Sequence, residues 1–114
     1  MPLYSAELYV GDVLYCASDY FYGSEKINAN SLVRYKTENF KLSVSNNSLR
    51  FGSSGYFKNS SMPFRLRNEY QIIAQDDYST FRIESSFNSD ELIFTYASAN
   101  SFDMGIMKGS CNKF

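Results

Sequence analysis

Apolar and polar residues alternate along much of this chain with a period of two, and short polar turns interrupt the alternation. A pattern of this kind predicts β-strands with one buried and one solvated face. A two-residue turn at 46–47 places Val44 opposite Leu49, and the next pair on the same face is also apolar. Asparagine tolerates the left-handed backbone of such turns. We therefore expect a β-hairpin here.

The second half of the chain predicts a meander of neighbouring strands. A turn at 76–77 would place Ile72 opposite Phe81, which again pairs apolar residues. Further strands are expected at 80–86, 92–99 and 102–111. The last two carry apolar residues on both faces, so several registers fit. Sequence-adjacent antiparallel strands are the expected arrangement.

The first half is less regular. Residues 7–10 and 13–16 flank Gly11-Asp12, which predicts either a hairpin with glycine at its first central position or a bulge in one long strand. Residues 18–31 are polar enough for a long connection. Residues 52–62 contain too much glycine and serine for a central strand, which indicates a loop or a bulged edge strand.

Together these runs predict an all-β fold with one domain over residues 1–114. About eight or nine short strands need two inner faces to bury their aromatic residues, so we expect a small antiparallel barrel or a barrel-like sandwich of about eight strands. The meander favours the barrel.

Composition and charge narrow the expected partners. Tyrosine and phenylalanine each occur ten times, which suits pleated, half-buried surfaces. The net charge of −1 does not favour binding to a phosphate backbone, so no nucleic acid partner is expected. No apolar run approaches the roughly 20 residues that a membrane-spanning helix needs.

The chain has no histidine, which removes Ser-His-Asp and Cys-His nucleophiles and every His-ligated metal site. Its adjacent carboxylates at 76–77 sit where acidic residues ordinarily form turns. We therefore expect a protein that is not an enzyme and carries no metal or cofactor.

The two cysteines, Cys16 and Cys111, lie near opposite ends of the chain. Barrel closure would bring them together as a disulfide, and the alternative is two reduced, buried thiols. A disulfide favours a periplasmic or secreted location. Residues 1–17 lack a basic leading segment and carry two acidic residues, unlike a signal peptide, so an exported form would have lost its leader.

Two groups of aromatic and apolar residues in the expected connections are the candidate partner-binding residues. They are Tyr20, Phe21, Tyr22, Tyr56, Phe57 and Met62. Aromatic loops on a rigid β scaffold favour a non-enzymatic binding or inhibitor module that recognises a protein. The same side chains could instead fold back and plug one end of the barrel.

Two other functions fit the predicted architecture. One is a lipocalin-like carrier, in which aromatic residues such as Tyr70, Phe81 and Phe94 line an interior that holds a small apolar ligand. The Gly-x-Trp signature of lipocalins is absent, because the chain has no tryptophan. The other is a structural component of an envelope or phage assembly.

Overall fold

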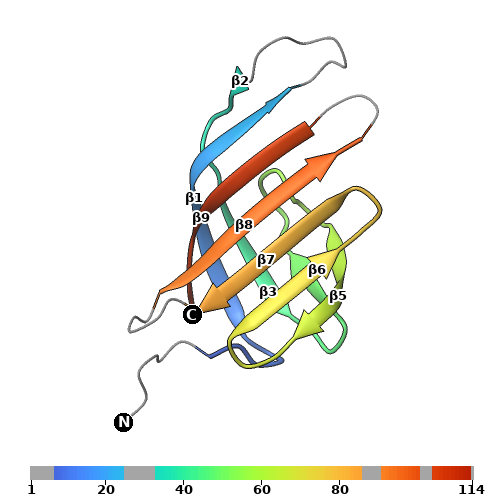
Figure 1. Ribbon diagram of the computed structural model, residues 1–114. Helices are drawn as coiled ribbons and strands as arrows, with labels where there is room; N and C mark the ends of the chain where they lie inside the picture. Colours follow the sequence, from blue (N-terminus) through green and yellow to red (C-terminus); the bar gives the residue numbers. More distant parts are fainter. Residues whose placement is uncertain (1–6, 25–32, 86–90, 101–103, 114) are drawn as a thin grey trace.

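The computed structural model describes residues 7–24, 33–85, 91–100 and 104–113, and these ranges form one antiparallel sheet that closes into a barrel (Figure 1). The strands are β1 (Val13–Ser24), β2 (Val33–Arg34), β3 (Asn39–Val44), β4 (Ser48–Phe51), β5 (Ser61–Arg67), β6 (Gln71–Gln75), β7 (Ser79–Ser85), β8 (Leu92–Ala99) and β9 (Met104–Lys113). From β3 to β9 each strand pairs with the next, and β1 pairs with both β3 and β9. The predicted all-β barrel with a meander is confirmed.

Strand β2 is an extra strand that continues the β3 side of β1. Arg34 of β2 pairs with Tyr22, and Asn39 of β3 pairs with Ala17, in the same antiparallel register. Between them, the Tyr35 amide donates to the Phe21 carbonyl at 2.8 Å. Residues 33–44 therefore act as one interrupted partner of β1, which lengthens the barrel wall at the far end of β1.

The two predicted hairpins have different outcomes. The β3–β4 register is confirmed, with Val44 opposite Leu49. The expected β6–β7 register is wrong by two residues, because Ile72 faces Ile83 rather than Phe81. The two-residue turn is 77–78, one position later than expected. A shift of two residues in the partner keeps each side chain on the same face, so Ile72, Phe81 and Ile83 are all buried.

The side chain of Asp76 explains the later turn. Its Oδ1 accepts hydrogen bonds from the amides of Tyr78, at 3.0 Å, and Ser79, at 2.8 Å. An aspartate that accepts from the amides two and three positions later belongs at the position before the turn. Asp76 therefore closes the hairpin rather than forming its tip.

The hairpin considered for residues 7–16 does not form. The Leu8 amide donates to the Glu69 carbonyl at 2.7 Å, and the Leu8 side chain is fully buried. A β-turn follows, in which the Asp12 amide donates to the Tyr9 carbonyl at 3.0 Å. Gly11 has φ +98° at the second central position, where a type II turn requires a positive φ. This turn directs the chain into β1.

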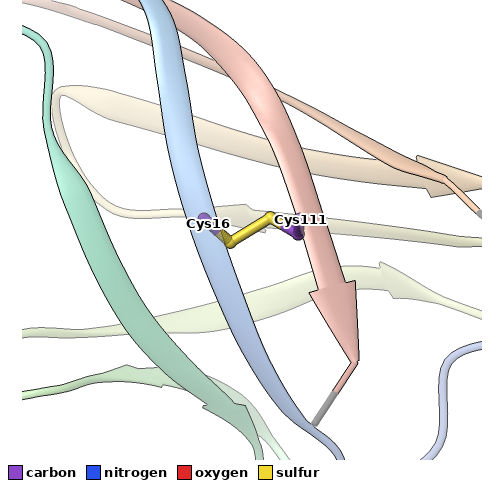
Figure 2. The surroundings of a disulfide bond; sticks show 2 residues. All are labelled: Cys16 and Cys111. Atoms are coloured by element: carbon purple, nitrogen blue, oxygen red, sulfur yellow. A yellow bond between two sulfur atoms is a disulfide. The ribbon is translucent and has the colours of Figure 1, made fainter.

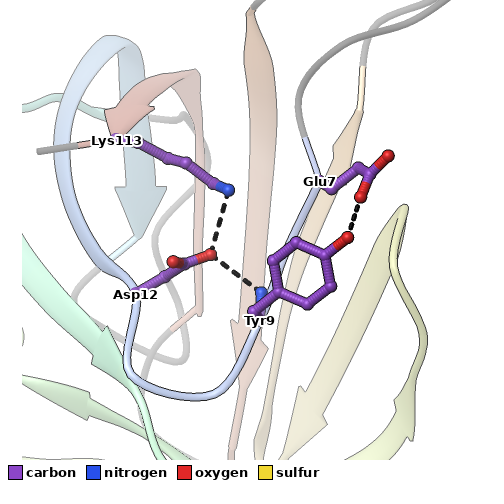
Figure 3. Close-up of polar contacts among 4 residues, drawn as sticks. All are labelled: Glu7, Tyr9, Asp12 and Lys113. Carbon is purple, nitrogen blue, oxygen red and sulfur yellow. Dashed lines mark hydrogen bonds and ion pairs between the residues drawn. The ribbon is translucent and has the colours of Figure 1, made fainter. Parts of the chain in front are cut away.

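Polar contacts tie this turn to the end of β9 (Figure 3). The Asp12 carboxylate accepts from the Tyr9 amide at 2.8 Å and lies 3.2 Å from the Lys113 ammonium. That ammonium lies 5.3 Å from the centre of the Tyr9 ring, and the Tyr9 hydroxyl donates to Glu7. The ion pair is partly exposed, so it contributes roughly 0 to 1 kcal/mol.

The predicted disulfide is confirmed and lies in the barrel wall (Figure 2). Cys16 of β1 and Cys111 of β9 are directly paired across the two strands, with 4.0 Å between their Cα atoms. Both side chains are buried. The bond therefore joins the first long strand to the last, at the seam where the barrel closes.

Phenylalanine rings fill the barrel interior. Neighbouring ring centres lie 4.6 to 6.1 Å apart, with Phe81 and Phe94 stacked at 5.3 Å. The rings belong to Phe40, Phe51, Phe57, Phe81 and Phe94. Such spacings are typical of aromatic packing in cores. In the described ranges we find no helix long and apolar enough to cross a membrane.

Candidate functional site

A β-bulge at Asp19 decides where the predicted tyrosines of β1 point. Ser18 pairs with Gly109 and Tyr20 pairs with Lys108, so Asp19 has no partner on β9. One extra residue reverses the alternation of the strand. Even-numbered side chains are buried before the bulge, whereas Phe21 is buried after it. Tyr20 and Tyr22 therefore face outward.

The bulge depends on a glycine across the seam. A Cβ at Gly109 would lie 2.0 Å from the Ala17 carbonyl oxygen and 2.7 Å from the Phe94 ring. No side chain fits there, because β9 approaches the bulged part of β1 too closely. Glycine inside a strand is a signal for a bulge or a close backbone approach, so Gly109 is the residue that could have indicated this place in the sequence.

Beyond the bulge, outward side chains form two rows across four strands. Each row takes one residue from β1, β9, β8 and β7, in that order, and the residues are joined by cross-strand pairing. The first row consists of Tyr22, Ile106, Ala97 and Thr80. The second row consists of Tyr20, Lys108, Thr95 and Arg82. Residues in register on one face of neighbouring strands contact one another. The two rows are therefore continuous across the outside of the barrel.

The two rows line a groove of about 570 Å³, which we call the outer groove. Its wall is largely apolar and includes Tyr20, which is 54% exposed, and Ile106, which is 47% exposed. Its charged groups are Arg82 and Lys108. Within the described ranges neither cation forms an ion pair, and no acidic side chain is among the residues that line the groove.

A second hollow, of about 400 Å³, lies at the end of the barrel where β1 finishes, and we call it the mouth pocket. It is lined by Phe21, Tyr35, Lys36, Glu38, Tyr56, Ser98, Met104 and Gly105. Tyr56 comes from the β4–β5 loop, and its ring meets that of Phe21 edge-on at 5.1 Å.

The structure separates the six predicted site residues into three places. Tyr20 and Tyr22 lie on a strand rather than in the expected connection, and they line the outer groove. Phe21 and Tyr56 line the mouth pocket. The other two, Phe57 and Met62, are buried in the core at 6% and 3% exposure, which matches the plugging alternative for these two.

The interior expected for a carrier is occupied by the protein itself. Phe81 and Phe94 are fully buried and stacked, as part of the packed ring cluster. Tyr70 was expected inside, but it is 37% exposed. The interior of an eight-stranded barrel is either filled by side chains or holds one small ligand, and here phenylalanine rings fill it.

Sequence reasoning missed Ile106, Lys108, Thr95 and Arg82 as groove residues. The signal was present in the run 102–111, which carries apolar residues on both faces although only one face can point into a barrel. Single exposed apolar residues are ordinary, whereas a contiguous apolar patch on the solvent face of a sheet marks a binding surface. Their neighbours on β7 and β8 follow only from the register.

Among the residues that the structure describes, no group of three or more metal-ligating side chains could hold a metal ion. Comparison with known proteins adds no assignment, because no protein-family model, no curated protein and no solved structure matches this chain.

Proposed function

We propose that this protein is a non-enzymatic binding module that recognises a protein partner through the outer groove. The observation that carries this proposal is an apolar, aromatic-lined groove on the outer face of a closed barrel. The outer face of a barrel strand is ordinarily polar because it meets water. Tyrosine rings that are partly exposed on a rigid sheet are the kind of residue that dominates protein interfaces.

The charges of the groove indicate the chemistry of the partner. Lys108 and Arg82 lie in one row with Thr95 between them. Neither cation has an ion-pair partner in the described ranges, which favours a partner surface that carries carboxylates. We therefore propose a partner segment that combines an apolar side chain, placed against Tyr20 and Ile106, with acidic residues beside it.

The disulfide supports a location outside the reducing cytosol. A buried cystine persists in oxidising compartments, such as the periplasm or the extracellular space. We propose that the module acts in such a compartment.

Site-specific photocrosslinking followed by affinity measurement tests the groove. A benzophenone amino acid is placed at position 106 and, as a matched control, at position 78, where Tyr78 is exposed on the β6–β7 turn. We expect position 106, and not position 78, to crosslink one defined protein. A crosslinked product common to both positions would contradict the proposal.

The purified partner then provides the quantitative test. We expect Ile106→Ser combined with Tyr22→Ser to weaken binding at least tenfold, and the control Tyr78→Ser to leave it unchanged. Reversing both cations with Arg82→Glu and Lys108→Glu should weaken binding further and reverse its salt dependence, because added salt would then screen a repulsion. Unchanged affinity in folded groove variants would rule out the outer groove as the binding surface.

A further inference from the structure

The mouth pocket is built around three aromatic rings that come from separate parts of the chain. Phe21 of β1 lies at its base and is 5% exposed. The Tyr35 ring packs on it at 4.8 Å with a tilt of 52°, and the Tyr56 ring meets it at 5.1 Å and 84°. The three rings therefore line one space and meet at different angles around it.

Two glycines shape this pocket in different ways. A Cβ at Gly23 would lie 2.7 Å from the Tyr35 ring, so the absence of a side chain lets that ring pack against β1. At Gly105 the nearest atoms to such a Cβ are 3.7 Å or more away. The missing side chain of Gly105 therefore leaves usable space, and packing did not require it to be glycine.

A carboxylate lies at the rim of the same pocket. Glu38 lines it, and its Oε2 lies 3.4 Å from where a Cβ would stand on Gly55, the residue before Tyr56. In the described part of the chain Glu38 forms no ion pair. Lys36 is also at the rim, but its side chain is exposed to solvent, whereas Glu38 is half-buried. Water screens the lysine charge more than the glutamate charge.

We propose that the mouth pocket binds a small organic cation of the quaternary or tertiary ammonium class. The cation sits over Phe21 between the Tyr35 and Tyr56 rings, and Glu38 supplies the counter-charge. Aromatic faces attract a cation through the ring quadrupole, and clusters of such faces recognise methylated ammonium groups. A carboxylate at the rim favours a cation over a neutral ligand of the same shape. The site is separate from the outer groove and does not depend on the function proposed for it.

Three probes that share the same bulky end and differ in charge test the ligand class. Choline carries a trimethylammonium group, 3,3-dimethyl-1-butanol is its neutral isostere, and 3,3-dimethylbutanoate is an anion with the same bulky end. Titrations are followed by amide chemical shifts of the labelled, oxidised protein. We expect choline to cause saturable shifts at Ser98, Gly105 and Tyr56, and the other two probes to bind at least tenfold more weakly. Equal or stronger binding of either one, or no shift with choline, would overturn the proposal.

Two variants at the rim of the mouth pocket test whether it prefers a cation or an anion. Glu38→Gln should weaken choline binding at least fivefold, whereas the matched Lys36→Gln should leave it unchanged or tighten it. The reverse response would mean that the pocket selects anions and would overturn the proposal.

A third variant tests the place of binding. An added Cβ at Gly105 has room, so Gly105→Ala should stay folded, and Gly105→Val should extend further into the pocket and abolish the choline shifts. Full choline affinity in folded Gly105→Val would overturn the assignment to this pocket, and the milder Gly105→Ala provides a second reading if the valine variant does not fold. The groove variant Ile106→Ser should retain choline binding, so failure of one site is distinguishable from failure of the other.

The same ammonium group occurs free in solution and on lipid headgroups. Binding of free choline without co-sedimentation with phosphatidylcholine vesicles supports a soluble ligand. Co-sedimentation that Gly105→Val abolishes supports a lipid headgroup.

Discussion

Gly105 and Gly109 both lie within strand β9, but their surroundings differ. Gly109 lies against the backbone of β1 at the bulge, where a Cβ would approach the Ala17 carbonyl oxygen to 2.0 Å. Gly105 faces the mouth pocket, with no atom closer than 3.7 Å to the same position. Only the first glycine is required by the fold.

This difference gives a prediction for a matched pair of variants. Gly109→Ala should lower the free energy of unfolding by about 3 kcal/mol, because backbone rather than a flexible side chain must move. Gly105→Ala should change it little or raise it by about 0.5 kcal/mol, because alanine loses less backbone entropy than glycine in a strand. Urea denaturation of the oxidised proteins measures both. Equal effects would contradict the close approach at Gly109.

The alternation of side chains around Asp19 shows how one residue changes a surface. Without the bulge, Tyr20 and Tyr22 would point into the barrel and Phe21 would point out. The bulge instead places one large ring in the mouth pocket and two on the outer groove. Both candidate sites therefore depend on this irregularity in β1.

At the level of elements, the apolar pattern of a hairpin can allow more than one strand register. Hydrogen bonds in the turn then select one of these registers. The pattern of 72–83 fits two registers that differ by two residues, and both bury the same face. Asp76 selects the observed one by accepting from the amides of Tyr78 and Ser79.

Adjacent aspartates allow this role to be tested. Asp76→Ala should lower the free energy of unfolding by about 1 to 2 kcal/mol, because two amides lose their acceptor. Asp77→Ala should change it by less than about 0.5 kcal/mol, since this exposed residue caps no amide in the described structure. Denaturant titration gives both values. A larger loss at position 77 would show that the turn is built differently.

For the whole molecule, the closing seam between β1 and β9 holds both ends of the fold together. The seam contains the disulfide, the bulge and the glycine that fits it, and the contact between Asp12 and Lys113 lies at its end. The cysteines are 95 positions apart, so the bond constrains most of the chain in the unfolded state. In the loop-entropy model, constraint over this length contributes about 4 to 5 kcal/mol.

Reduction should therefore lower the free energy of unfolding by about 4 to 5 kcal/mol. The variant Cys16→Ala with Cys111→Ala, measured without reductant, should show a similar loss. A thiol reagent in denaturant should find no reactive thiol before reduction and two afterwards. Two reactive thiols in freshly purified protein from an oxidising compartment would contradict the disulfide and remove the main support for the proposed location.

Local patterns were sufficient for the all-β class and for most strands, but not for β1 beyond Ala17, where a connection was expected. Period-two alternation is a property of neighbouring residues, so Val44 and Leu49 could be paired from the sequence alone. The cysteines could also be paired, because a closed barrel places its first and last strands side by side. Short-range chemistry determines the alternation within the strands, whereas the cysteine pair follows only from the closure of the barrel.

The candidate sites were decided by tertiary structure. Tyr20, Ile106 and Arg82 are far apart in the chain, and they share a surface only because β1, β9, β8 and β7 pair in one register. The bulge at Asp19 arises from the fit between two strands and has no strong signal in the residues beside it. Phe57 and Tyr56 are neighbours in sequence, yet one is buried in the core and the other is 49% exposed at the mouth. Contacts between distant strands determine such differences, and a local pattern contains no information about them.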